Sequence, residues 1–260
     1  MKKVFCEFTA DGVEKPSCND IRNNCPTCET NFYNMEMPSG EQVNLFCKIE
    51  KGAVVDGSCK AIKEICPGCQ SGFFFFEMFA QNSNRFCDMN VDGGGWLAVG
   101  NVRLTSANQV AGMLTSINTG YQISKLNQIQ NGKFMLSNSD IGTLFKNGGY
   151  TEVRVKCFKP YHGRTLHVKF SGNVVYKWLV NRERTLGVCG SAQFFGNDNS
   201  KTSKHDCNDI YIGWTRHTSS MDFLVVGKYH IHFKDDRFEC DDHHVDNNYN
   251  NLGNWLFYVR

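Results

Sequence analysis

Alternation of apolar and charged residues marks strands along the second half of the chain. Within Thr151–Phe158, the residues Val153, Val155 and Cys157 alternate with Arg154 and Lys156, which is typical of a strand with one buried face. Tyr229–Phe233 alternates in the same way, so we expect His230 and His232 to face solvent rather than bind a ligand. The strands predicted are Leu97–Val102, Tyr150–Phe158, Leu166–Phe170, Val174–Val180, Ile210–Trp214, Phe223–Phe233 and Trp255–Val259.

Helical spacing of apolar residues occurs in two shorter stretches, Ile123–Ile129 and Asp140–Phe145. The second begins after Ser139, and Ser139 with Asp140 forms a reasonable cap region. Phe73–Phe76 is apolar at every position, which favours a strand buried on both faces, with an exposed partner surface as the alternative. Helices and strands are thus mixed, and we expect an α+β fold.

The first ninety residues contain an internal repeat with an offset of 41 residues, which closes to 40 at the last cysteine. The matching positions are Ser17-Cys18 with Ser58-Cys59, Cys25-Pro-Thr-Cys28 with Cys66-Pro-Gly-Cys69, and Phe46-Cys47 with Phe86-Cys87. Phe5-Cys6-Glu7 matches the tail of a third copy. We therefore divide the chain into a Cys-rich repeat extension, residues 1–57, and a main domain, residues 58–260.

The chain has 13 cysteines, which favours an oxidising compartment and a secreted, extracellular protein. The two Cys-Pro-x-Cys pairs allow three interpretations: disulfides, a four-cysteine zinc site, or a redox pair. The 37 residues between the pairs exceed the spacing of a zinc ribbon. Their repetition favours structural disulfides.

Charge excludes two classes of partner. The net charge is +2, from 28 basic and 26 acidic residues without long blocks of either sign, so binding to nucleic acid or to a bilayer surface has no support. No run of 18 apolar residues occurs, and we expect no membrane span.

Three successive glycines lead into a tryptophan in Arg85–Trp96, Arg-Phe-Cys-Asp-Met-Asn-Val-Asp-Gly-Gly-Gly-Trp. This segment resembles the opening signature of the fibrinogen-related domain, which is shared by ficolins, tachylectins and intelectins. The ending Asn254–Arg260, preceded by Phe238–Asp242, resembles the galactose-binding lectins of sea anemones. The resemblance implies a central twisted, mostly antiparallel sheet with short helices, long metal-binding loops and several disulfides.

The resemblance also implies disulfide pairs. Cys59 would pair with Cys87 and Cys189 with Cys207, and repetition adds Cys18 with Cys47. Cys157 and Cys240 are candidates for a further pair. Cys6 is then our candidate for an interchain bond in a disulfide-linked homo-oligomer; a non-covalent homo-oligomer is the alternative.

Acidic residues are concentrated in two segments. Residues 235–248 hold six carboxylates and two histidines, and calcium, which binds six to eight oxygens, would relieve their repulsion. A solvated acidic loop is the alternative. The second segment contains Asp198, Asp206 and Asp209, where the family keeps a calcium loop, and His205-Asp206-Cys207 resembles the His-His-Cys run of intelectins.

These segments give a predicted site. The calcium ligands would be Glu239, Asp241, Asp242 and His244, with Asp198, Asp206 and Asp209 as ligands in the second segment. The sugar would contact the first four residues together with His243 and Tyr249. We expect Trp255 to lie in the core rather than stack on a sugar.

The resulting hypothesis is a calcium-dependent lectin for glycans with terminal galactose or a similar diol, acting in innate immunity, agglutination or cell recognition. The alternative is an extracellular matrix protein whose fibrinogen-like module binds no sugar. Nucleophile-elbow and phosphate-loop motifs are absent from the sequence, and we expect no enzyme.

Overall fold

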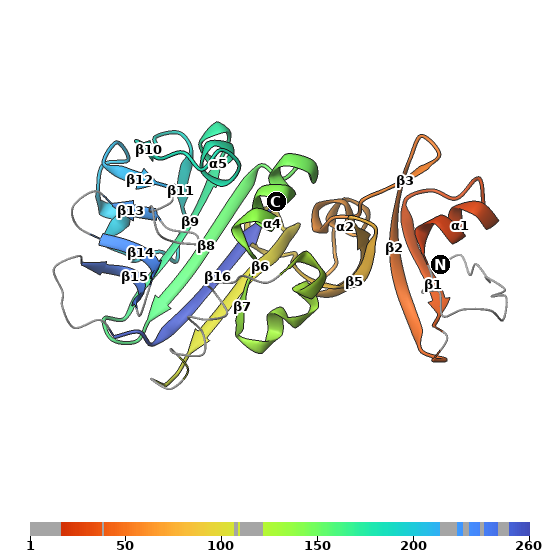
Figure 1. Cartoon of the computed structure of the whole chain (residues 1–260), viewed down its shortest axis with the longest axis horizontal. Helices are drawn as coiled ribbons and strands as arrows, with labels where there is room; N and C mark the ends of the chain where they lie inside the picture. The colour runs from red at the N-terminus through yellow and green to blue at the C-terminus, as the bar shows by residue number, and fades with distance from the viewer. Residues whose placement is uncertain are drawn as a thin grey trace. The chain divides into compact units, whose positions relative to one another are not determined.

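The computed structural model describes residues 17–37, 39–106, 109, 122–213, 223–225, 229–234, 237–243 and 250–260. The chain forms two compact units, Met1–Leu97 and Ala98–Arg260 (Figure 1). Both copies of the repeat lie in the first unit. The division into a repeat extension, residues 1–57, and a main domain, residues 58–260, stays a prediction.

The first unit consists of two similar halves, each with a short helix and an antiparallel pair of strands. Its elements are α1 (Cys18–Asn24), β1 (Asn31–Glu36), β2 (Gln42–Glu50), β3 (Ala53–Val55), α2 (Cys59–Ile65), β4 (Gly72–Met78), β5 (Gln81–Asp88) and the 3₁₀ turn η1 (Val91–Gly93). Both helices begin at a serine, where Ser17 accepts from the Asp20 N–H and Ser58 from the Ala61 N–H. The strand order is β1-β2-β4-β5, and the halves join by parallel pairing of β2 with β4.

The Gly-Gly-Gly-Trp segment forms a sharp turn after β5. The φ angles of Gly93, Gly94 and Gly95 are 79°, 79° and 76°, a region that favours glycine. A Cβ on Gly94 would lie 2.2 Å from the Met89 carbonyl oxygen. The turn places Trp96 in the core at 0% exposure, and its indole N–H donates to the Val91 carbonyl at 3.0 Å.

The second unit contains two sheets and short helices. Its elements are β6 (Trp96–Leu104, which begins in the first unit), η2 (Ile123–Asn131), β7 (Lys133–Met135), α4 (Asn138–Asn147), β8 (Glu152–Lys159), β9 (Arg164–Ser171), α5 (Asn173–Leu179), β10 (Thr185–Leu186), β11 (Ala192–Phe194), η3 (Thr202–Lys204), β12 (Ile210–Ile212), β13 (Phe223–Val225), β14 (Tyr229–Lys234), β15 (Arg237–His243) and β16 (Gly253–Val259). The larger sheet has the order β6-β16-β8-β9-β11, with β7 on β6, and the smaller has the order β10-β12-β13-β14-β15. Figure 1 shows β8, β9 and β16 side by side in the larger sheet.

The fold class agrees with the sequence: mostly antiparallel sheet, short helices and many disulfides. In the described part of the chain, six disulfides join Cys18–Cys47, Cys25–Cys28, Cys59–Cys87, Cys66–Cys69, Cys157–Cys240 and Cys189–Cys207. The four expected pairs are among them, and both Cys-Pro-x-Cys pairs form disulfides. Cys6 lies outside the described residues.

Three predicted elements differ from the structure. The stretch Val174–Val180 is not a strand but helix α5, because Val174, Val175, Trp178 and Leu179 fall on one helical face and are buried. The stretch Phe223–Phe233 forms two strands, β13 and β14, instead of one. Helix α4 begins earlier than expected, at the N-cap Ser137, whose hydroxyl accepts from the Asp140 N–H.

The expectation that Phe73–Phe76 is buried on both faces is wrong. Phe76 is 0% exposed, but Phe73 on the opposite face is 39% exposed and contacts the edge of Phe86. Trp255, in contrast, lies in the core as predicted, at 0% exposure. Across the described part of the chain, no helix is long and apolar enough to span a membrane.

Candidate functional site

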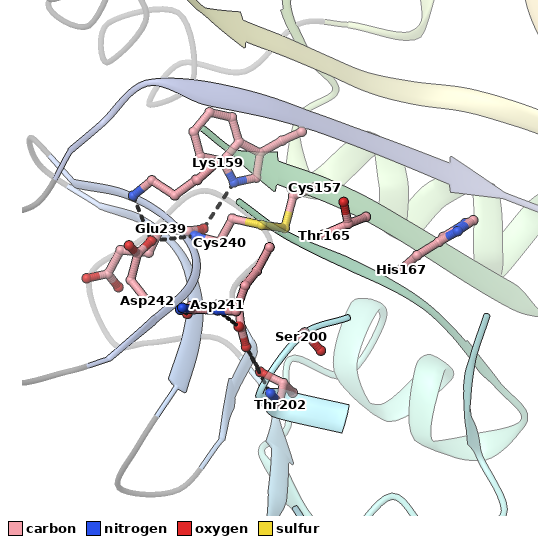
Figure 2. Close-up of a disulfide and its surroundings, with 12 residues drawn as sticks. Cys157, Lys159, Thr165, His167, Ser200, Thr202, Glu239, Cys240, Asp241 and Asp242 are labelled. Atoms are coloured by element: carbon pink, nitrogen blue, oxygen red, sulfur yellow. Dashed lines mark hydrogen bonds and ion pairs between the residues drawn. A yellow bond between two sulfur atoms is a disulfide. The ribbon is translucent and has the colours of Figure 1, made fainter. Parts of the chain in front are cut away.

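The predicted acidic residues lie on β15, which the Cys157–Cys240 disulfide joins to β8 (Figure 2). Glu239 and Asp241 are 0% exposed and Asp242 is 6% exposed. The side chains of Glu239 and Asp241 are therefore not accessible to a sugar in solvent. His244 and Tyr249, the other predicted residues of this segment, are outside the described residues.

Asp241 is held by hydrogen bonds on both carboxylate oxygens. It has a φ of 59° and occupies a bulge where the β14–β15 register shifts. Its Oδ1 accepts from the Thr202 backbone N–H at 2.9 Å and the Thr202 hydroxyl at 2.7 Å, and its Oδ2 accepts from the Lys201 N–H at 2.9 Å. The Arg164 guanidinium also donates to Oδ2. Asp241 thereby fixes the start of η3 and neutralises Arg164.

Asp242 forms a buried ion pair with Lys159. The ammonium nitrogen lies 2.7 Å from Oδ2, and the two side chains are 0% and 8% exposed. Oδ2 also accepts from the Cys240 N–H at 2.8 Å, and Lys159 donates to the Phe238 carbonyl at 3.0 Å. Burial lowers the pKa of Lys159 from its usual 10.5, and the charge of Asp242 opposes this shift.

Glu239 is bonded to histidine rather than to solvent. Nδ1 of His230 lies 3.0 Å from Oε2 of Glu239, and the His230 side chain is 13% exposed. The expectation that His230 faces solvent is therefore wrong, because a buried carboxylate on the neighbouring strand draws it inward. The side chain of His232 is outside what the structure describes. Trp255 donates its indole N–H to the Glu239 carbonyl at 3.0 Å.

These contacts do not fit a shared calcium site. Calcium needs six to eight oxygens around one centre, whereas Glu239, Asp241 and Asp242 each bond a different partner within the protein. A carboxylate has about four lone-pair sites, and Asp241 already accepts four hydrogen bonds. Charge density predicted a cation here, and the positive charges next to Asp242 and Asp241 are those of Lys159 and Arg164.

Hydrogen bonds hold the second acidic segment next to β9. Oδ2 of Asp198 accepts from the His167 N–H at 2.7 Å, and Oδ1 accepts from the Ser200 N–H and hydroxyl at 3.0 and 2.9 Å. Asn197 Oδ1 lies 2.6 Å from Nδ1 of His167. Burial lowers the pKa of His167 below its usual 6.5. Asp198 thus acts as a turn-forming residue.

Asp206 and Asp209 lie on the exposed loop near the Cys189–Cys207 disulfide. Oδ1 of Asp206 accepts from the N–H and the amide of Asn208 at 2.8 and 2.9 Å. Within the described residues, Cys189, Asp206 and Cys207 are the one group of three whose potential ligand atoms lie within 4.8 Å of one another. Both cysteines are in a disulfide, so the group offers a cation only one carboxylate.

A cluster of rings and cations surrounds Tyr229, and the sequence did not reveal it. The Tyr229 ring lies 5.8 Å from the His205 ring and 5.1 Å from the His243 ring. Arg164 and Lys201 place their cationic groups 5.7 and 5.5 Å from the ring centre. We call these five residues the Tyr229 cluster.

The members of the Tyr229 cluster are partly or fully exposed and come from four segments: β9, the loop around η3, β14 and β15. Of the predicted site residues, His243 belongs to it. The hydrogen bonds of Asp241 to Arg164 and to the Lys201 backbone hold two of its members in place. The acidic strand therefore supports a surface that contains donors and aromatic faces.

Comparison with solved structures finds similar chains, two of which are described here. No family model and no curated protein matches the chain. The fibrinogen-like globe domain of human ANGPTL6 matches with a TM-score of 0.41 and 11% identity, over 82% of this chain and 97% of that one. The fibrinogen-like globe domain of human ANGPTL2 matches with a TM-score of 0.39 and 14% identity, over 78% and 97%. The interpretation of the chain as fibrinogen-related thus depends on its own residues and disulfides.

Proposed function

We propose that this chain carries an extracellular recognition module of the fibrinogen-related type, a binding protein and not an enzyme. The Cys59–Cys87 bridge before the Gly-Gly-Gly-Trp turn and the Cys189–Cys207 bridge support this type. Six disulfides favour an oxidising, extracellular environment.

The module's ligand is a glycan, and the Tyr229 cluster is where it binds. Two imidazole rings and two cations within 6 Å of one phenol ring carry this proposal. An aromatic face packs against the C–H face of a sugar ring, while the phenol, imidazole and ammonium groups hydrogen-bond its hydroxyls. Terminal galactose is the first sugar to test, because the Phe238–Asp242 segment and the chain ending resemble galactose-binding lectins.

Calcium is not required by the contacts proposed here. The described carboxylates on β15 are already bonded to Lys159, Arg164 and His230. The calcium dependence expected from the sequence is therefore not part of this proposal, and a chelator tests it separately from sugar binding.

Retention on galactose-agarose, with and without a chelator, tests the proposal. We expect the wild type to be retained in both conditions and Tyr229→Ala to flow through. Tyr176→Ala is the matched control, because Tyr176 is a 42% exposed tyrosine on α5. Equal retention of Tyr229→Ala would refute the site. Failure of the wild type to bind any sugar matrix would favour the matrix-protein alternative.

A further inference from the structure

A pocket of about 950 Å³ lies in the first unit, where both copies of the Cys-rich repeat contribute to its walls. β2 of the first copy and β4 of the second line it with residues that include Val43 and Phe75. Every residue of this lining belongs to the described part of the chain. Ligand pockets in proteins have volumes of about 300–1,000 Å³, so this pocket has room for a ligand.

The pocket lies beside the end of the pairing between β2 and β4. Their parallel ladder joins residues 45–46 to residues 75–76. β2 already begins at Gln42 and β4 at Gly72, so each strand extends beyond the ladder at its N-terminal end. Among the described strands, none pairs with the facing edges of these first residues. Such edges present N–H and C=O groups with which another strand can pair.

The walls are aromatic on both faces of the sheet. Side chains alternate along a strand, so Phe73 and Phe75 lie on one face of β4 and Phe74 on the other, where its ring centre is 6.3 Å from that of Phe32. Phe73 is 39% exposed, and the other three rings are half-buried. A chain extended along these strand edges would therefore contact aromatic rings on both of its sides.

The charge of the lining is negative. Glu29 and Glu41 line the pocket and are exposed, whereas Lys, Arg and His are absent from the lining. Glu29 precedes β1 and Glu41 precedes β2, and these two strands are antiparallel. The two carboxylates therefore lie toward opposite ends of the β1–β2 hairpin, and each attracts a cation.

Disulfides hold the rim of the pocket. The Cys25–Cys28 and Cys66–Cys69 pairs, one from each copy of the repeat, both contribute to the lining. The Tyr33 hydroxyl donates to the Glu29 carbonyl and so holds the segment that carries this carboxylate. A rim that is fixed before binding loses little conformational freedom when a ligand binds.

We propose that this pocket, which we call the inter-repeat groove, binds an extended peptide segment of a partner protein, with apolar residues between basic ones. The peptide adds a strand to the facing edges of β2 and β4 through main-chain hydrogen bonds. Its apolar side chains pack on the phenylalanine rings, and its basic side chains pair with Glu29 and Glu41. A small organic cation could not pair with the strand edges. The groove is independent of the proposed sugar site, which lies in the second unit.

Calorimetric titration of synthetic peptides into the full-length chain tests the groove. The probe is Arg-Val-Phe-Val-Arg with blocked ends. One control is Glu-Val-Phe-Val-Glu, and the other is the basic peptide with N-methyl groups on its three central residues. We expect the probe to bind at least about tenfold more tightly than the acidic peptide, because two attractive charge pairs replace two repulsive ones. The N-methylated peptide should also bind at least about tenfold more weakly, because it lacks the N–H donors that pair with a strand edge.

Variants and hydrogen exchange locate the bound peptide. The double variant Glu29→Gln, Glu41→Gln should weaken binding of the probe about three- to tenfold. Glu50→Gln is the matched control, because it makes the same change of charge at an exposed residue of β2 outside the pocket. Its effect should be less than about twofold. Binding of the probe should slow amide exchange at residues 42–44 and 72–74 and leave that of β5 unchanged.

Four outcomes would overturn the proposal. The first is failure of the probe to bind, and the second is equal affinity for the probe and either control peptide. The third is a loss of affinity in Glu50→Gln as large as that in the double variant. The fourth is exchange protection elsewhere in the chain but not at the edges of β2 and β4. Retention on galactose-agarose is measured separately, so failure of the groove and failure of the sugar site are distinguishable.

Discussion

Lys159 on β8 donates a 2.7 Å hydrogen bond to Asp242 on β15, and the two side chains are 0% and 8% exposed. The pair lies two residues from each end of the Cys157–Cys240 disulfide, so a covalent link and an ion pair join the same two strands. The positive charge that the acidic segment needs therefore comes from the protein's own strands.

Lys159→Met should lower the free energy of unfolding by about 3–5 kcal/mol, because it leaves the Asp242 carboxylate buried without its cation. Denaturant unfolding with the disulfides intact measures this. Lys169→Met is the control: its ion pair with Glu152 is 3.5 Å long and partly exposed, so its loss should cost about 1 kcal/mol or less. Equal effects of the two variants would contradict a buried structural pair.

Asp241→Asn separates a structural role from a metal-binding role. We expect the calcium-free protein to lose about 2–4 kcal/mol of stability, because the variant removes the buried carboxylate that pairs with Arg164. Unfolding of the metal-stripped variant and wild type is the measurement. A calcium ligand would instead give equal stability without calcium and a difference only after calcium is added.

His167 should make the fold sensitive to mild acid. Burial lowers its pKa below 6.5, so between the folded pKa and pH 6.5 the unfolded chain binds more protons than the folded one. Stability from neutral His167 is then complete above about pH 6.5 and is lost as the pH falls from there toward the folded pKa. We expect His167→Gln to flatten this part of the stability–pH curve. A slope identical to that of the wild type would exclude His167 as the cause.

Gly94→Ala should destabilise the first unit by at least about 2 kcal/mol, because the added Cβ would lie 2.2 Å from the Met89 carbonyl oxygen at a φ of 79°. Gly68→Ala is the matched control, since nothing lies within 4 Å of its added Cβ. The unfolding midpoints of the two variants give the comparison. A neutral Gly94→Ala would show that the turn has another conformation.

Apolar stretches predicted the strands β8, β9 and β16, and the alternation within Thr151–Phe158 indicated the core face of β8. The same reasoning failed at α5, where β-branched Val174 and Val175 favoured a strand although the burial has helical spacing. Disulfide pairs were predictable because the repeat and the family resemblance give them in sequence. The contacts of the candidate site, in contrast, depend on tertiary structure and could not be predicted from the sequence.

The candidate site consists of contacts between residues that are distant in the sequence. Carboxylate density indicated a need for positive charge, but nothing near residue 239 in the sequence shows that Lys159 and Arg164 lie beside these carboxylates. The sequence predicted only that Tyr229 lies on one face of a strand. Its neighbours His205 and Lys201 are more than twenty positions away and reach it through the Asp241 hydrogen bonds to η3.

Calorimetric titration of galactose into the metal-stripped protein tests the central claim most directly. If sugar is bound by the Tyr229 cluster, the wild type should give a saturable binding isotherm without calcium, and Tyr229→Ala should give none while keeping its folded stability. An isotherm that appears only after calcium is added, and that Tyr229→Ala leaves unchanged, would contradict the account.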